Sequence, residues 1–253
     1  TCSRKMLRLI TVLVCIGFTR AAPSKIVNGT NAEKGEIPYI VSLRVGGRHT
    51  CGGSILNENH VLTAAHCLSN RKYSIQYGVL QLSSDNTNSI DVEKIMRHEY
   101  YDPYNRHAND VAVLKLKSAI PIDNVNVRPT TLPSQAESAP DGKWGVLAGW
   151  GAVITGGGAY KQLQRVDILV YSPVNCRAAH GNSVNEKYHL CAGVPEGWKG
   201  QCSGDSGGPL VAEGKQVGVV SWSIKPCAVV GYPGVFARVA SYTDWIWSKV
   251  DLN

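Results

Sequence analysis

Three short patterns carry residue types that together suit acyl transfer. His66 lies in the segment TAAHC, Asp110 in NDVAVL, and Ser206 in GDSGGP. Taken alone, each has a plainer explanation, such as a structural histidine or a turn residue. Together they supply a hydroxyl nucleophile, an imidazole that can take its proton, and a carboxylate that orients the imidazole. The glycines around Ser206 let backbone N–H groups converge where an oxyanion would form. These patterns predict a Ser-His-Asp nucleophilic centre.

The elements that must position these residues are mostly strands. Short β-rich runs separated by Gly, Asn and Pro predict antiparallel barrels or sandwiches rather than a parallel α/β sheet. Only the C-terminus predicts a clear helix, because Ser241 to Asp244 has the form of a capping box, and Tyr242, Trp245, Ile246 and Lys249 recur at helical spacing. The predicted strands are 37–45, 54–56, 60–63, 73–80, 111–116, 145–149, 163–171 and 216–222.

Composition bounds the class of protein. The chain has 253 residues, with 43% hydrophobic and 18% charged residues, 26 glycines and 12 prolines. These values indicate a globular protein with many turns, and they exclude disorder, coiled coil and collagen. The net charge is +7, but residues 1–25 hold five cations and no anion, and the rest of the chain holds 21 cations and 19 anions. No basic stripe remains, which argues against nucleic-acid binding.

The first residues have the pattern of a targeting signal. A basic start is followed by a ten-residue apolar run at 9–18 and then by Ala21-Ala22. A bilayer span needs ~20 residues, so the run is too short to cross a membrane. The pattern predicts a secretory signal peptide, with a buried strand as the alternative. We therefore expect a secreted, extracellular protein with no membrane segment.

Cysteine usage fits an exported chain. Of eight cysteines, Cys2 and Cys15 lie in the predicted signal segment. An even number remains, which predicts three disulfides, although six cysteines allow 15 pairings. The absence of a CxxC pair argues against a zinc or redox site, and we expect no metal and no cofactor. The remaining six are Cys51, Cys67, Cys176, Cys191, Cys202 and Cys227.

The whole segment from Ile26 onward resembles the chymotrypsin/trypsin family of secreted serine proteases. The order His, Asp, Ser is that of this family. Further matching stretches are IVNG from Ile26, CGGS from Cys51, GWG from Gly149, CAG from Cys191, SW from Ser221 and PGV from Pro233. The resemblance implies two six-stranded antiparallel barrels with the catalytic groups in the cleft between them. The Pro-rich segment 128–140 is the expected linker, giving a signal and activation segment at 1–25, an N-terminal barrel at 26–133, and a C-terminal barrel with the helix at 134–253.

The resemblance also implies roles for individual residues. Ser206 would be the nucleophile, His66 the general base and then acid, and Asp110 the orienting carboxylate. The N–H groups of Gly204 and Ser206 would form the oxyanion hole. The implied disulfides are Cys51–Cys67, Cys176–Cys191 and Cys202–Cys227.

The bond between Lys25 and Ile26 resembles the family's activation site. Cleavage there, by a trypsin-like enzyme, would free an ammonium group on Ile26. This ammonium would pair with Asp205 and so set the oxyanion hole beside Ser206. We therefore expect a zymogen.

The pocket that sets substrate preference departs from the pattern of trypsins. Trypsin-like members carry Asp six positions before the nucleophile, where this chain has Gly200. A cation buried without a carboxylate is strongly disfavoured. With Ser221, Ser223 and Gly234 as the other pocket residues, we expect a chymotrypsin-like preference for apolar or aromatic residues, with elastase-like specificity as the alternative. Gln201 either reaches into the pocket, favouring medium side chains such as Leu or Met, or turns away.

Two classes of function remain at this point. The complete set of His66, Asp110 and Ser206 favours an enzyme over a non-catalytic homologue that acts as a binding protein. The expected partners are protein and peptide substrates, the activating protease and protein inhibitors, with the enzyme itself a monomer.

GVLQ at Gly78 replaces the acidic loop with which trypsins bind calcium, and Asn28 begins a glycosylation sequon whose use stays open.

Overall fold

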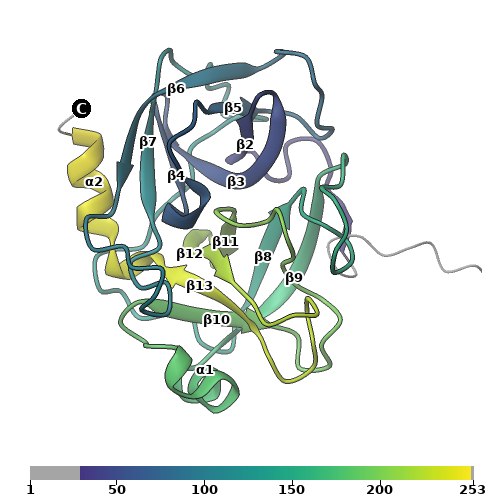
Figure 1. Ribbon diagram of the computed structural model, residues 1–253, viewed down its shortest axis with the longest axis vertical. Helices are drawn as coiled ribbons and strands as arrows, with labels where there is room; N and C mark the ends of the chain where they lie inside the picture. Colours follow the sequence, from purple (N-terminus) through teal and green to yellow (C-terminus); the bar gives the residue numbers. More distant parts are fainter. Residues whose placement is uncertain (1–28, 252–253) are drawn as a thin grey trace, which may run out of the picture.

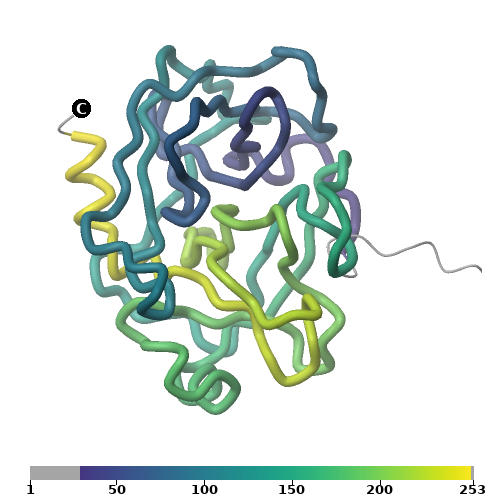
Figure 2. Tube along the Cα trace, viewed as in Figure 1, coloured from purple at the N-terminus to yellow at the C-terminus, as the bar shows by residue number. Residues whose placement is uncertain are grey.

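The computed structural model describes residues 29–251, and Figures 1 and 2 show two β-barrels side by side. The predicted signal peptide, the activation site at Lys25 and Ile26, and Asn28 lie outside the described residues. The fold expected from the resemblance is confirmed, since each barrel closes from six antiparallel strands.

The first barrel has the strand order β2-β3-β4-β7-β6-β5. Its core holds alternating apolar residues such as Val41, Leu43 and Ile55, all fully buried. The alternation has period two, so one face of each strand fills the interior. Its strands are β2 (Ile40–Val45), β3 (Arg48–Asn57), β4 (His60–Thr63), β5 (Ser74–Tyr77), β6 (Ser89–Arg97) and β7 (Ala112–Leu116).

The second barrel follows the order β9-β10-β13-β12-β11-β8, with β8 also pairing with β9 to close it. The short strand β1 (Thr30–Asn31) precedes the first barrel in sequence but pairs with β9 of the second. The strands are β8 (Trp144–Gly149), β9 (Gln164–Tyr171), β10 (His189–Gly193), β11 (Pro209–Ala212), β12 (Lys215–Trp222) and β13 (Gly234–Arg238).

A shared apolar cluster joins the barrels. It combines Leu62 and Val113 of the first barrel with Val219 of the second and Ile246 of the C-terminal helix α2 (Thr243–Asp251). Ile246 is fully buried, and burying such a side chain contributes roughly 2 kcal/mol. The helix lies along the flank of β7 in Figure 1. The cluster holds the two barrels, and therefore the cleft between them, in one fixed arrangement.

The start of α2 differs from the sequence-based expectation. The backbone N–H of Asp244 donates to Gln135 Oε1, 3.0 Å away, and no hydrogen bond from Ser241 Oγ is formed within residues 29–251. Gln135 also donates to the Ser241 carbonyl at 3.3 Å. Gln135, in the segment between the barrels, thus caps the helix, whereas the local sequence pattern predicted a cap from Ser241.

A second helix, α1 (Pro173–His180), was not predicted. Ser172 accepts from the Asn175 N–H at 3.2 Å, Pro173 occupies the first turn, and Gly181 follows at φ +57°. These are ordinary start and stop signals for a helix, so the sequence contained the information. Short 3-10 turns at Ala65–Cys67, Gly181–Ser183 and Val239–Ser241 complete the helical elements of the described chain.

Candidate active site

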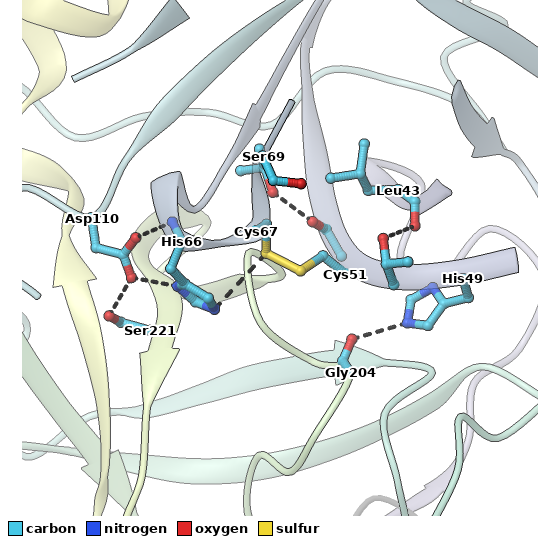
Figure 3. The surroundings of a disulfide bond; sticks show 12 residues. Leu43, His49, Cys51, His66, Cys67, Ser69, Asp110, Gly204 and Ser221 are labelled. Carbon is cyan, nitrogen blue, oxygen red and sulfur yellow. Dashed lines mark hydrogen bonds and ion pairs between the residues drawn. A yellow bond between two sulfur atoms is a disulfide. The ribbon is translucent and has the colours of Figure 1, made fainter. Parts of the chain in front are cut away.

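His66 and Asp110 meet at the edge of the first barrel. His66 lies on the turn directly after β4, and Asp110 lies just before β7, the strand that pairs with β4. The His66 N–H donates to Asp110 Oδ1 at 2.9 Å, and the ring Nδ1 lies 2.7 Å from Oδ2 (Figure 3). Because a carboxylate only accepts, Nδ1 carries the proton and Nε2 is left with its lone pair. This is the tautomer that a general base requires.

A third group, Ser221 on β12, fixes the same carboxylate from the second barrel. Its hydroxyl donates to Asp110 Oδ2 at 2.5 Å, across 111 residues of sequence. Burial raises the pKa of Asp110, but hydrogen bonds from His66 and Ser221 outweigh it, so the pKa lies below its ordinary value. Asp110 is therefore a buried, ionised and fully oriented carboxylate. Ser221 is also one of the residues predicted for the specificity pocket, and its contact with Asp110 is a further role that the sequence did not indicate.

Close approach of backbone explains the glycines around Ser206. The Gly52 N–H of β3 donates to the Ser206 carbonyl at 2.7 Å, which ties the nucleophile loop to the first barrel. A Cβ on Gly52 would lie 2.9 Å from Gly208 Cα, and one on Gly207, at φ +79°, would lie 2.3 Å from Thr63 Oγ1. Only glycine permits these contacts. The motifs CGGS and GDSGGP are thus two sides of one interface between the barrels.

The predicted oxyanion donors are unengaged. Among the described residues, neither the Gly204 N–H nor the Ser206 N–H donates to another protein atom. Ser206 is partly exposed, and no hydrogen bond joins its Oγ to His66 Nε2 within residues 29–251. Nε2 lies 3.9 Å from Cys67 Sγ, in the disulfide that anchors the histidine turn. Catalytic hydrogen bonds are often long in unliganded enzymes and tighten when substrate binds.

Beside this loop lies His49, a residue that sequence analysis did not single out. Its Nε2 donates to the Gly204 carbonyl at 2.9 Å, and its Nδ1 accepts from the Ser42 hydroxyl at 2.8 Å. Burial lowers the pKa of His49 to about 4, so the ring is neutral at physiological pH. As a neutral donor, His49 therefore fixes the Gly204 carbonyl without adding charge.

Asp205 is completely buried. Its carboxylate accepts from the Gly151 N–H at 2.8 Å and the Cys202 N–H at 2.9 Å. A Cβ on Gly149 would lie 2.2 Å from Oδ1, which explains why the segment GWG is glycine-flanked. Burial raises the pKa of Asp205 to about 6, and no cation forms an ion pair with it within residues 29–251. Burial therefore disfavours the ionised form of this carboxyl.

The three disulfides implied by the resemblance are present: Cys51–Cys67, Cys176–Cys191 and Cys202–Cys227. The first lies beside His66 in Figure 3. The third joins the nucleophile loop to the segment before Gly234. The first and third therefore fix parts of the site, and the second joins α1 to β10.

Four of the residues predicted for the specificity pocket lie together. Gly200, Gln201, Ser223 and Gly234 line one cavity, and no Asp or Glu is among the described lining residues. Gln201 points inward and is 4% exposed. The sequence had left this orientation open.

His107 is a further residue near the catalytic histidine that sequence analysis missed. The two rings meet edge-on, with centroids 6.1 Å apart. The local sequence HANDV, residues 107–111, does not predict this contact, because the path of the loop before Asp110 brings His107 to His66.

Comparison with known proteins agrees with this geometry. The family model described as trypsin matches residues 26–246. The chain belongs to the trypsin family of serine proteases. It is a serine endopeptidase that hydrolyses peptide bonds in proteins.

Named relatives extend over nearly the whole chain. Trypsin-1 of Astacus astacus is 38% identical over 87% of this chain and 98% of the relative. Trypsin II-P29 of Gallus gallus is 37% identical over 96% of this chain and 98% of the relative. Serine protease 1 of Homo sapiens is 35% identical over 96% and 98%. Two of these three relatives are named trypsin. Because position 200 of this chain is the uncharged Gly200, membership of the trypsin family does not by itself establish its substrate specificity.

Proposed function

We propose that this trypsin-family protease is secreted as a zymogen, is activated by cleavage after Lys25, and cuts next to uncharged rather than basic residues. In this proposal Ser206 attacks the scissile carbonyl, His66 takes and returns the proton, and Asp110 holds the imidazole. The N–H groups of Gly204 and Ser206 stabilise the oxyanion. The observation that carries the proposal is the buried Asp110, which is oriented by His66 and Ser221 from two different barrels.

Labelling with a serine-directed fluorophosphonate tests the nucleophile. The activated wild-type enzyme should be labelled, and Ser206→Ala should be unlabelled and lose proteolysis while still folded. Ser203→Ala, a change three positions away in the same loop, is the matched control and should still be labelled. A Ser206→Ala variant that keeps a tenth of wild-type turnover would refute the assignment, and an unlabelled wild type would favour the non-catalytic homologue.

The activation proposal rests on Asp205. A fully buried carboxylate with two backbone donors and a raised pKa is stabilised by a nearby positive charge. The ammonium that cleavage after Lys25 would create on Ile26 can supply this charge. An ion pair there would hold the peptide between Asp205 and Ser206, and with it one oxyanion donor.

The specificity proposal rests on the pocket. Gly200 has no side chain, and its φ of +153° disfavours any side chain there. No acid lines the cavity among the described residues, whereas Lys199 does. An Arg or Lys side chain would therefore be buried without a partner, which is costly. A chymotrypsin-like preference for apolar or aromatic residues would require Gln201 to leave the pocket, and the inward position of Gln201 favours the elastase-like alternative.

The expected partners follow from this chemistry. Protein and peptide chains are the substrates, a trypsin-like protease is the activator, and protein inhibitors that occupy the cleft are further partners. We propose a secreted, extracellular monomer with no metal and no cofactor. Within residues 29–251, no helix is long and apolar enough to cross a bilayer.

A further inference from the structure

The side chain of Gln201 lines the cavity that we propose as the specificity pocket. Its Nε2 donates to the carbonyl of Trp222 at 2.8 Å and to the carbonyl of Val235 at 3.3 Å. Trp222 ends β12 and Val235 lies on β13, so the amide bridges two strands of the second barrel. Two hydrogen bonds and 4% exposure hold it in place.

The orientation of this amide follows from its neighbours. Carbonyl oxygens only accept hydrogen bonds, so the NH₂ group must face Trp222 and Val235. The oxygen Oε1 then faces the other way, where it is buried and has no partner among the described residues. A Cβ on Gly234 would lie 2.6 Å from Oε1, which places this oxygen against the Gly234 wall of the pocket. The pocket thus presents a buried acceptor without a donor.

Little space remains beside the amide. The cavity lined by Gly200, Gln201, Ser223 and Gly234 measures about 10 Å³, which is room for about one water molecule. An aromatic ring can enter only if Gln201 leaves and gives up both hydrogen bonds.

We propose that Gln201 determines the substrate class of this enzyme. It selects a short, uncharged side chain before the scissile bond, and among side chains of equal size it favours one with an O–H or N–H donor. This inference rests on the proposed serine-protease function with an uncharged pocket. A buried acceptor left unpaired weakens binding of the apolar isostere, which is the physical basis of the donor preference.

The experiment compares kcat/KM on peptides that differ only at the residue before the scissile bond. For the activated wild type we expect Thr to exceed Val and Asn to exceed Leu several-fold, and all four to exceed Phe and Tyr at least tenfold. Gln201→Met has nearly the same length but no acceptor, so the donor preference should vanish while aromatic residues stay poor. Gln201→Ser removes the obstruction, so the rates on Phe and Tyr should rise at least tenfold.

Gly234→Ala gives a second, independent readout. Its new Cβ would collide with Oε1, so it should displace the amide and lower the rates on Thr and Asn. The same change in the Gln201→Ser background should have a smaller effect, because no amide remains to displace. Fluorophosphonate titration and thermal melts establish that each variant is folded and active.

The outcomes separate the two levels of the proposal. Wild-type rates on Phe or Tyr equal to those on Thr and Asn, with Arg still poor, would overturn the role of Gln201 and leave the uncharged pocket intact. Equal rates within the Thr–Val and Asn–Leu pairs would likewise overturn the donor preference. A wild-type rate on Arg above all others would instead refute the proposed specificity itself.

Discussion

Replacing Asp205 with Asn tests the activation mechanism in the uncut chain. Burial raises the pKa of this carboxyl to about 6 from its ordinary value of 3.8. A carboxyl with a raised folded pKa stabilises the fold below its unfolded pKa, and this contribution is lost as pH rises through the folded pKa. The window is therefore roughly pH 4 to 6. At ~1.36 kcal/mol for each pKa unit, ionisation costs roughly 3 kcal/mol of unfolding free energy by neutral pH.

The assay is the unfolding of the uncut wild type and Asp205→Asn from pH 4 to pH 7. Asn lacks the ionisation, so the stability of the variant relative to wild type should rise by roughly 3 kcal/mol across this range. For a chain of this size that corresponds to a relative gain in Tm of roughly 6–12 °C. Loss of the hydrogen bonds from the Gly151 and Cys202 N–H groups would lower the stability of the variant by a similar amount at every pH, so it adds little pH dependence in this window.

Asp123→Asn provides a control whose titration lies outside this window. Backbone hydrogen bonds from Val127 and Val125 lower the pKa of Asp123, so its contribution is present above the unfolded pKa and is lost as pH falls below it. Because the ordinary pKa is 3.8, the stability of this variant relative to wild type should change little from pH 4 to pH 7 and should not rise. A difference between Asp205→Asn and wild type that is flat from pH 4 to pH 7 would refute the reasoning that Asp205 is an unpaired buried charge in the uncut chain.

Three further predictions concern the activated enzyme. Lys25→Gln should resist trypsin activation, and full peptidase activity from an uncut chain, verified by N-terminal sequencing, would contradict this. A free α-amino group has a pKa of roughly 7.7–8.0, and pairing with Asp205 should raise the pKa of the Ile26 α-amino group. The ion pair therefore stabilises the active form below the free pKa, and this stabilisation is lost as pH rises through the raised pKa. Activity should fall reversibly at alkaline pH, and an unchanged alkaline limb in an active enzyme lacking Asp205 would count against the pair. On peptides that differ only before the scissile bond, cleavage after Arg should be at least about a hundredfold slower than after the preferred uncharged residue, a ratio that corresponds to ~2.8 kcal/mol. Gly200→Asp should reduce this ratio and also lower Tm, because a side chain at φ +153° strains the backbone by about 1–3 kcal/mol. An unchanged ratio in the folded variant would show that position 200 does not set the charge preference.

Where sequence analysis succeeded, the signal was local. Strand β4 has the predicted bounds, and β7, β8, β9 and β12 begin within one residue of them. Strand β6 was missed because its register shifts between Val92 and Lys94, which breaks the alternation that marks a strand. Helix α1 was missed although Ser172 and Pro173 form a recognisable start, since the helix is only eight residues long.

Sequence by itself determined the chemistry available to this protein. The residue types and chain order of His66, Asp110 and Ser206, the glycines beside them and the uncharged position Gly200 are properties of short segments, and each has a local physical meaning. The family resemblance then carried the disulfide pairing and the two-barrel fold.

Tertiary structure alone decided how these groups act. The contact of Ser221 with Asp110, the hydrogen bond from His49 to Gly204 and the cap that Gln135 gives to α2 join residues that are distant in the chain. The direction of Gln201 was open in sequence because a glutamine side chain has several rotamers of similar energy. The carbonyls of Trp222 and Val235 select one of them, and those carbonyls come together only when β12 and β13 pair.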